Sequence, residues 1–234
     1  MILPLTPQLV LNLVAAGHET TASALQWATY ALVKYPVAQE QLRAEVLDLL
    51  KRNPVPEYSE IEGLSYMSNF YKEVLRLWCP GTEYPRLLIW QFFGAVTQIA
   101  NASNHLAIST PRQPVEDIVI DGILIPKGTT VTVMPAIIHL NPHIWGDDAD
   151  QFKPSRWTQG PIDPHAFAAF SQGPRQCLGK VWSALEFKII LIEILSKFRF
   201  AAVGTEDVVL VNPSPLLRPK EGMKVKVEKL PAGS

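Results

Sequence analysis

The chain is short of cysteine, of net charge and of membrane-spanning apolar segments, and each shortage narrows the class of protein. Its 234 residues include two cysteines, Cys79 and Cys177, which lie far apart and do not suggest a disulfide framework. The net charge of −1 gives no reason to expect nucleic acid as a partner. Residues 1–16 are apolar but lack the basic leader region and cleavage site of a signal peptide. They continue directly into polar residues, so we interpret them as part of a buried core helix.

What is present indicates one globular domain. The composition is 47% hydrophobic and 18% charged, in a chain long enough for a sizeable core. Prolines number 20 against 13 glycines, and most prolines follow residue 78. This distribution predicts helices first and extended or looped structure later.

The most informative stretch is residues 170–179, which read F-x-x-G-x-R-x-C-x-G. Cys177 precedes an expected helix, and the positive end of that helix together with Arg175 favours the thiolate. Gly173 and Gly179 allow backbone conformations closed to other residues and a close approach by a flat ligand. A lone thiolate on a rigid loop suits the axial position on haem iron and does not suit structural zinc. The alternative is a cysteine that acts as a small buried hydrophobe.

The recurring apolar positions over residues 6–33 predict one long helix, which the polar group 17–21 interrupts. A threonine hydroxyl in that group can bond to an earlier carbonyl, bending the helix and opening a groove. An ordinary kink and a solvated Glu19 are the alternatives.

Two further amphipathic helices are expected before residue 79. Residues 37–52 place leucine and valine inward and charges outward, with Arg43 among the outward residues. Residues 66–78 carry Glu73 and Arg76, which lie three apart on one face and can pair. A surface ion pair of this kind is common and contributes little, so the pair alone is a weak motif.

The second half of the chain predicts short strands and one more helix. A meander is expected over residues 117–133, with a turn at 121–122, and strands and turns over 199–230. The helix 181–198 is expected to place four residues on its core side, Leu185, Ile189, Ile192 and Leu195. His139 and His143 could be imagined as a metal pair, but Pro142 breaks any helix between them and we reject that reading.

Taken together and in order, these motifs resemble the C-terminal half of the cytochrome P-450 family, the haem-thiolate monooxygenases. The segment 16–21 resembles the A-G-x-[DE]-T-[TS] signature of that family's long central helix, and residues 152–157 copy its F-x-P-x-R-[WF] segment. The resemblance implies a mainly α fold with small β-sheets, built from the central helix, the E-x-x-R helix, the cysteine-ligand loop and the following helix. The fungal-type microsomal class is expected.

The resemblance also implies roles for individual residues. Cys177 would be the axial ligand of haem iron, in a loop with Phe170, Gly173, Arg175 and Gly179. Thr20 would help to bind and protonate dioxygen, and Glu19 would take part in proton delivery. Glu73, Arg76 and Arg156 would form a structural charge network that holds the cysteine loop.

The sequence departs from the family pattern over residues 81–110, which we interpret as an insertion or an unspliced segment. Arg86 and Arg112 both compete for the haem propionate, and the downstream context favours Arg112. The parts are then a helical part over 1–78, this segment, a sheet, meander and haem loop over 111–180, and a helix with a C-terminal sheet over 181–234. Pro213 to Leu217 would touch substrate, on analogy alone.

The implied function is insertion of one oxygen atom of O2 into an apolar organic substrate, with haem b as cofactor and an NADPH-dependent reductase as electron donor. The full-length family is expected at the cytoplasmic face of the endoplasmic reticulum membrane, and this chain shows no anchor of its own. Nothing in the sequence matches the family's N-terminal half. The alternative function is therefore a truncated, catalytically inactive fragment of such an enzyme.

Overall fold

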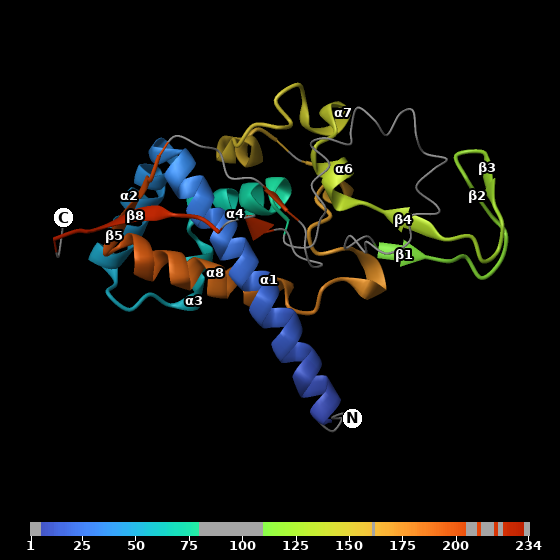
Figure 1. Cartoon of the computed structure of the whole chain (residues 1–234), viewed down its shortest axis with the longest axis horizontal. Coiled ribbons are helices and arrows are strands. Elements are labelled where there is room, and N and C mark those ends of the chain that lie inside the picture. The colour runs from blue at the N-terminus through green and yellow to red at the C-terminus, as the bar shows by residue number, and fades with distance from the viewer. Residues whose placement is uncertain are drawn as a thin grey trace.

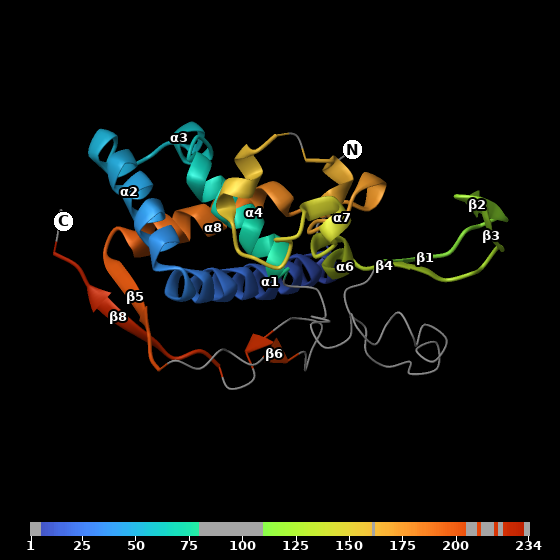
Figure 2. The ribbon, with the colours of Figure 1, turned by 90° about the horizontal axis from the view of Figure 1, so that it is seen from above.

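The computed structural model describes residues 6–79, 110–160, 162–204, 210–211, 218–219 and 222–231. Within them a helical body is formed by five helices, α1 (Pro7–Lys34), α2 (Pro36–Arg52), α3 (Tyr58–Glu62), α4 (Ser65–Leu77) and α8 (Lys180–Leu195). The C-terminal half of α1 packs beside α2, α4 and α8, and its N-terminal half extends beyond them (Figures 1 and 2). Arg86 and Pro213 to Leu217 lie outside the described residues, as does the segment 81–110 apart from Thr110.

Helix α1 begins at a threonine cap and continues unbroken through the polar group 17–21. The Thr6 side chain accepts a hydrogen bond from the Leu9 amide, and Pro7 occupies the first turn, where its missing N–H costs nothing. The Thr20 hydroxyl donates to the Ala16 carbonyl at 2.6 Å, as the sequence predicted for a threonine of this group. The long helix is confirmed.

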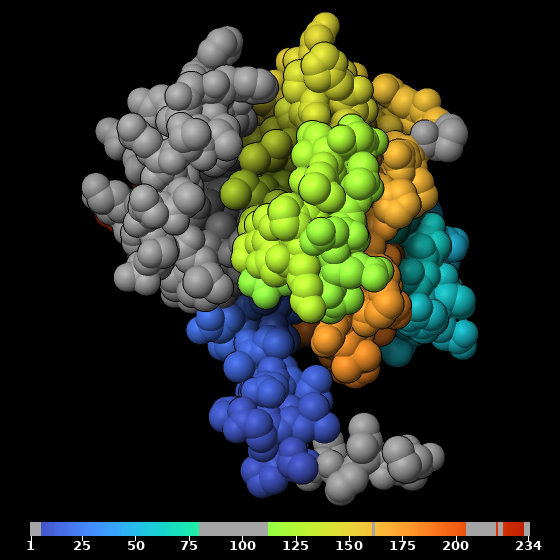
Figure 3. Space-filling model, turned by 90° about the vertical axis from the view of Figure 1, so that its right-hand side faces the viewer, coloured from blue at the N-terminus to red at the C-terminus, as the bar shows by residue number. Residues whose placement is uncertain are grey.

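The burial of α1 differs between its two halves. Trp27, Ala28, Ala31 and Leu32 are fully buried in the helical core. The expectation that the apolar N-terminal half is also a core helix is wrong, because its large side chains are 38–62% exposed, as Leu9, Val10, Leu11, Leu13 and Val14 show. No described element packs against this half, and it projects from the body in Figure 3.

The core joins all the long helices through leucine, methionine and aromatic side chains. Phe70 of α4, Leu42 of α2 and Phe187 of α8 are fully buried in one cluster. An aromatic stack extends this cluster, with ring centroids 6.1 Å apart for Trp27 and Trp78 and 5.6 Å apart for Trp78 and Phe152. The stack ties the end of α4 to α1 and to the segment before residue 154.

Two expectations about helix faces are wrong. Arg43 was expected to face outward, but it is buried and its guanidinium donates to the Leu195 carbonyl at 2.6 Å, which satisfies the C-terminal turn of α8. Ile189 was expected on the core side of α8 and is 46% exposed. Its neighbour Lys188 is buried instead, because its stem packs in the core while its ammonium meets Glu62 at 2.9 Å.

Each described sheet is an antiparallel pair of strands. The pairs are β1 (Thr110–Arg112) with β4 (Val131–Val133), β2 (Ile118–Ile120) with β3 (Ile123–Ile125), β5 (Phe198–Ala202) with β8 (Val225–Lys229), and β6 (Leu210–Val211) with β7 (Arg218–Pro219). Asp121 and Gly122 join β2 to β3 with positive φ angles of 48° and 77°, the geometry of a tight hairpin turn. The predicted mainly α fold with small β-sheets is confirmed.

Short helical turns connect the sheets to the helical body. They are α6 (Pro135–His139), α7 (Pro142–Trp145) and the 3-10 turns η2 (Pro154–Thr158), η3 (Pro164–Ala166) and η4 (Gly173–Arg175). A proline stands in the first turn of each, where its fixed φ favours helical entry.

A buried charge network joins α4 to η2. The Glu73 carboxylate accepts two hydrogen bonds from Arg76, at 2.8 and 2.9 Å, and one from Arg156 at 3.3 Å. The indole N–H of Trp157 also donates to Glu73, at 2.9 Å. The side chains of Glu73 and Arg76 are 0% exposed and that of Arg156 is 8% exposed. Every buried side-chain nitrogen and oxygen in the described part of the chain has a partner.

The second carboxylate of the network is at its edge. Asp148 accepts a hydrogen bond from Arg156 at 2.7 Å and one from Lys153 at 2.9 Å. These two hydrogen bonds lower the pKa of Asp148 to about 2. The network therefore holds two carboxylates against two guanidinium groups and a lysine.

Replacement of Arg76 by methionine should destabilise the fold strongly. The change leaves the Glu73 charge buried with one guanidinium fewer, and breaking a buried pair costs about 3–5 kcal/mol. Urea denaturation of Arg76→Met measures this loss. Arg52→Ala is the matched control, because the pair of Arg52 with Asp48 is 60% and 72% exposed and should contribute about 0–1 kcal/mol. Equal losses in the two variants would contradict the assignment.

Candidate functional site

The cysteine loop reverses the chain just before α8. Ser171 and Gly173 have positive φ angles of 55° and 70°, and the Cys177 amide donates to the Phe170 carbonyl at 2.8 Å. The Gln176 amide closes the η4 turn on the Gly173 carbonyl at 3.0 Å. These bonds fix the backbone at Cys177, whose side chain is exposed. Cys177 lies two residues before Gly179, the N-cap of α8.

The two glycines of the loop have different structural reasons. Gly173 needs its φ of 70°, which L side chains adopt only under strain. Gly179 has a φ of −82°, so the expectation that it needs a conformation closed to other residues is wrong. A Cβ at Gly179 would lie 3.9 Å from the Cys177 sulfur, an ordinary contact.

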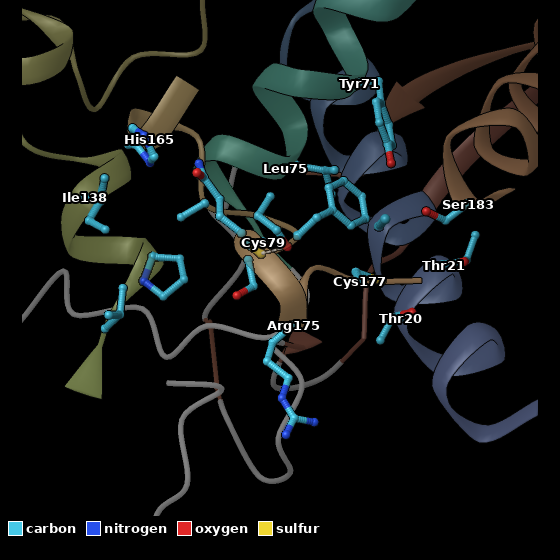
Figure 4. A pocket seen from close by; sticks show the side chains of 18 of the residues that line it. Thr20, Thr21, Tyr71, Leu75, Cys79, Ile138, His165, Arg175, Cys177 and Ser183 are labelled. Carbon is cyan, nitrogen blue, oxygen red and sulfur yellow. Dashed lines mark hydrogen bonds between the residues drawn. The ribbon is translucent and has the colours of Figure 1, made fainter. Parts of the chain in front are cut away.

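The loop forms one wall of a cavity of about 620 Å³. Helix α1 contributes Thr20 and Thr21, helix α4 contributes Tyr71 and Leu75, and Figure 4 shows these side chains around the same space as Cys177. Arg112 and Arg175 are also lining residues, and Arg175 extends away from Leu75 in Figure 4. The same two arginines line an adjoining hollow with Gln113 and Thr130.

The structure brings some of the expected site residues together and leaves others apart. Thr20, Arg112, Phe170, Arg175 and Cys177 all line the cavity. Glu19 is on the same helix as Thr20 but is exposed and is not a lining residue. Gly173 shapes the loop through its positive φ and Gly179 is the N-cap of α8, and neither lines the cavity. Glu73, Arg76 and Arg156 do not line it either; their network joins α4 to η2.

Among the lining residues that were not assigned from the sequence are two with reactive side chains, Cys79 and Tyr71. Cys79 lines the cavity, and its thiol donates weakly to the Ala169 carbonyl at 3.8 Å. Tyr71 also lines it, and burial raises the pKa of Tyr71 while a hydrogen bond with Ser183 opposes that shift. The contacts of His139 were missed as well; it is fully buried and does not line the cavity. The one signal in the sequence that could have found Tyr71 and Cys79 was their position. Tyr71 is on the same helix as Glu73 and Arg76, and Cys79 follows just after that helix.

His139 makes hydrogen bonds through both ring nitrogens. Its Nδ1 lies 3.1 Å from the Arg76 carbonyl, and its Nε2 accepts from the Ala168 amide at 2.9 Å. A nitrogen that accepts carries no proton, so the proton is on Nδ1. Burial and the neighbouring Arg76 charge lower the pKa of His139 to about 4. Both nitrogens are therefore occupied, and no group of three or more His, Cys, Asp or Glu residues able to hold a metal occurs among the described residues.

The cavity fits a flat, largely apolar group that carries two carboxylates and an iron ion. Its walls are mostly apolar, and the guanidinium groups of Arg112 and Arg175 stand at its side. Two cysteines line it, but Cys79 is buried with its thiol directed to the Ala169 carbonyl, whereas Cys177 is exposed. Such a group needs one protein ligand and opposite charge for its carboxylates, which is the donor set found here.

The model of the cytochrome P450 family matches residues 6–89 and 103–227. The chain belongs to this family. The match passes over residues 90–102, which lie within the segment that departs from the family pattern. Curated relatives of the P-450 chain come from several organisms. The P-450 chain is 32% identical over 230 residues to the cytochrome P-450 monooxygenase sphH of Aspergillus fumigatus, covering 93% of this chain and 37% of the relative.

Two further relatives come from a plant and from human. The P-450 chain is 34% identical over 186 residues to a cytokinin hydroxylase of Arabidopsis thaliana, covering 79% of this chain and 31% of the relative. It is 34% identical over 223 residues to cytochrome P-450 4F11 of Homo sapiens, covering 93% and 37%. The chain thus spans less than half the length of these relatives. Their spread over three kingdoms does not select the fungal-type class.

None of the helices described for this P-450 chain combines the length and the apolar content that a membrane span requires.

Acid should destabilise the P-450 chain through His139. In the unfolded chain the imidazole protonates near its ordinary value of 6.5, whereas in the fold its pKa is about 4. The unfolded state binds more protons between these values, so stability present above pH 6.5 is lost as the pH falls toward 4. The full loss is on the order of 3 kcal/mol, because one pKa unit corresponds to about 1.4 kcal/mol.

The free energy of unfolding, measured in urea from pH 7.5 to 4, checks this expectation. His139→Gln removes the titrating group and should flatten the dependence, while His143→Gln, at an exposed histidine, should leave it in place. A wild-type dependence that persists unchanged in His139→Gln would show that other groups cause it.

Proposed function

We propose that this chain carries the haem-thiolate site of a monooxygenase, with Cys177 as the axial ligand of haem b. The observation that carries the proposal is the exposed Cys177 thiol on a loop closed by its own amide, at the wall of an apolar cavity. Family membership supports the same role. Haem bound there would supply the activation of O2 and the insertion of one oxygen atom into substrate.

The residues around the cavity have separate tasks in this proposal. Arg112 and Arg175 would hold the haem propionates, since guanidinium groups bind carboxylates in a bidentate fork. Phe170 would supply an apolar face, and Gly173 shapes the loop that carries the thiolate. Gly179, which has no side chain, would let the flat haem approach the loop closely. The Glu73, Arg76 and Arg156 network keeps that loop in place.

In this proposal Thr20, at the cavity wall, and Glu19, which does not line the cavity, handle protons. The Thr20 hydroxyl donates to Ala16, so its oxygen is left to accept a hydrogen bond from a group in the cavity. Rotation of the hydroxyl would break the bond to Ala16 and turn the proton toward the cavity. Glu19, exposed one residue earlier on α1, connects this position with solvent.

The partners follow from the reaction class. Electrons come from an NADPH-dependent reductase, and the substrate is a small apolar organic molecule that the apolar cavity wall accommodates. For the full-length protein we propose the cytoplasmic face of the endoplasmic reticulum membrane. The segment 81–110 remains an insertion or an unspliced piece in this proposal.

A second candidate function is haem binding without turnover. The apolar N-terminal half of α1 is exposed, and Leu178 and Trp182, which follow Cys177 in the chain, are 89% and 74% exposed. Exposed apolar surface of this kind marks an interaction site or an aggregation risk. If this surface stays exposed, water would reach the cavity. Oxygen activation depends on controlled water access, so turnover would be lost. Haem uptake without substrate oxidation would favour this second function.

The optical spectrum of the reduced, CO-bound protein tests the ligand assignment. Wild type and Cys79→Ser should show the red-shifted Soret band of a thiolate ligand, and Cys177→Ser should lose it. Cys79→Ser is the matched control because Cys79 lines the same cavity. A band that survives in Cys177→Ser, or that disappears in Cys79→Ser alone, contradicts the assignment.

A further inference from the structure

His139 connects the charged helix to the cysteine loop, and no part of the proposed function uses it. Its ring lies between α4 and the segment before Phe170, and it is 0% exposed. Arg76 donates from its Nη1 to the His139 carbonyl at 2.7 Å, and His139 Nδ1–H donates back to the Arg76 carbonyl at 3.1 Å. The two residues thus exchange hydrogen bonds, so the orientation of the imidazole is fixed from the α4 side.

The other ring nitrogen holds the loop. Nε2 accepts from the Ala168 amide at 2.9 Å, while the Phe167 ring stacks on the imidazole with centroids 5.5 Å apart and planes at 19°. From Ala168 a short series of backbone bonds reaches the thiol. The Ser171 amide donates to the Ala168 carbonyl at 3.1 Å, and the Cys177 amide donates to the Phe170 carbonyl at 2.8 Å.

We propose that His139 is the positioning residue that fixes the cysteine loop against helix α4, with Nδ1–H held by Arg76 and Nε2 holding the Ala168 amide. The inference rests on the proposed role of Cys177 as haem ligand for its effect on the haem. The geometry itself concerns protein atoms alone. A core histidine that merely fills space needs no particular tautomer. His139 needs one, because Nδ1 must donate and Nε2 must accept.

The alternative ties between α4 and the loop are weaker. The Cys79 thiol reaches the Ala169 carbonyl only at 3.8 Å, and a thiol is a poor donor. The charge network reaches the loop side through the Trp157 ring, which packs edge-on against Phe167 at 5.1 Å. His139 supplies the strong, directional link.

The first test needs no substitution and no haem. In the uniformly 15N-labelled chain, nuclear magnetic resonance should show an unprotonated Nε2 on His139 and a scalar coupling across the hydrogen bond between that nitrogen and the Ala168 amide nitrogen. A protonated Nε2, or the absence of the coupling with a neutral ring, overturns the proposal. This arm gives a decision even if the chain takes up no haem and the proposed function fails.

The second test separates the two nitrogens by substitution. In His139→Gln the side-chain oxygen reaches the Nε2 position and accepts from Ala168. In His139→Asn the amide stands at the Nδ1 position, retains the Arg76 contact and leaves Ala168 unpaired. Native-state hydrogen exchange of the Ala168 amide should accelerate about tenfold or more in the asparagine variant and little in the glutamine variant. Equal exchange in both variants contradicts the proposal.

Haem-loaded protein provides the functional readout. The fraction of CO complex with a red-shifted Soret band, and the haem reduction potential, should stay near wild type in His139→Gln and in the exposed control His143→Gln. Both should change in His139→Asn, and in His139→Phe, which keeps the stacking on Phe167. Changes that simply follow the urea midpoint across all four variants would show a role in stability alone and overturn the proposal.

Discussion

The whole arrangement depends on one buried carboxylate. Glu73 is inaccessible to water, so its charge is tolerable only because Arg76, Arg156, Trp157 and the Lys153 amide donate to it. Arg76 then uses its remaining donors on the His139, Ala149 and Gln151 carbonyls, which fixes the segment between α6 and η2. A chain section with little regular structure thereby gains a defined position. Packing alone would not give that precision, because apolar contacts lack direction.

A series of contacts connects this network to the cavity. His139 connects Arg76 to Ala168, the loop bonds connect Ala168 to Cys177, and the cavity places Thr20 of α1 among the same lining residues. The contacts nearest the thiol are backbone hydrogen bonds, which depend on conformation more than on side-chain identity. This explains how a loop with a strained Ser171 and a glycine at φ 70° keeps one shape. In the proposed function the buried charges position the loop, and the reactive groups lie at the cavity wall.

Much of this could be predicted from sequence because it is local or periodic. The E-x-x-R spacing places Glu73 and Arg76 on one face, and the helices over 7–34 and 36–52 follow from apolar periodicity. What failed depends on tertiary partners. Arg43 is buried because the end of α8 needs a donor, and Leu9 to Val14 are exposed because no described element covers them. His139, before a proline-containing turn, gave no sign in sequence of its two backbone partners.

Iron K-edge X-ray absorption on the haem-loaded chain tests the central claim most directly, because it reports the atoms bound to iron. If Cys177 is the haem ligand, iron has one sulfur neighbour in the wild type and in Cys79→Ser, and only nitrogen and oxygen neighbours in Cys177→Ser. A sulfur signal that persists in Cys177→Ser, or that is absent from the haem-loaded wild type, would contradict this claim.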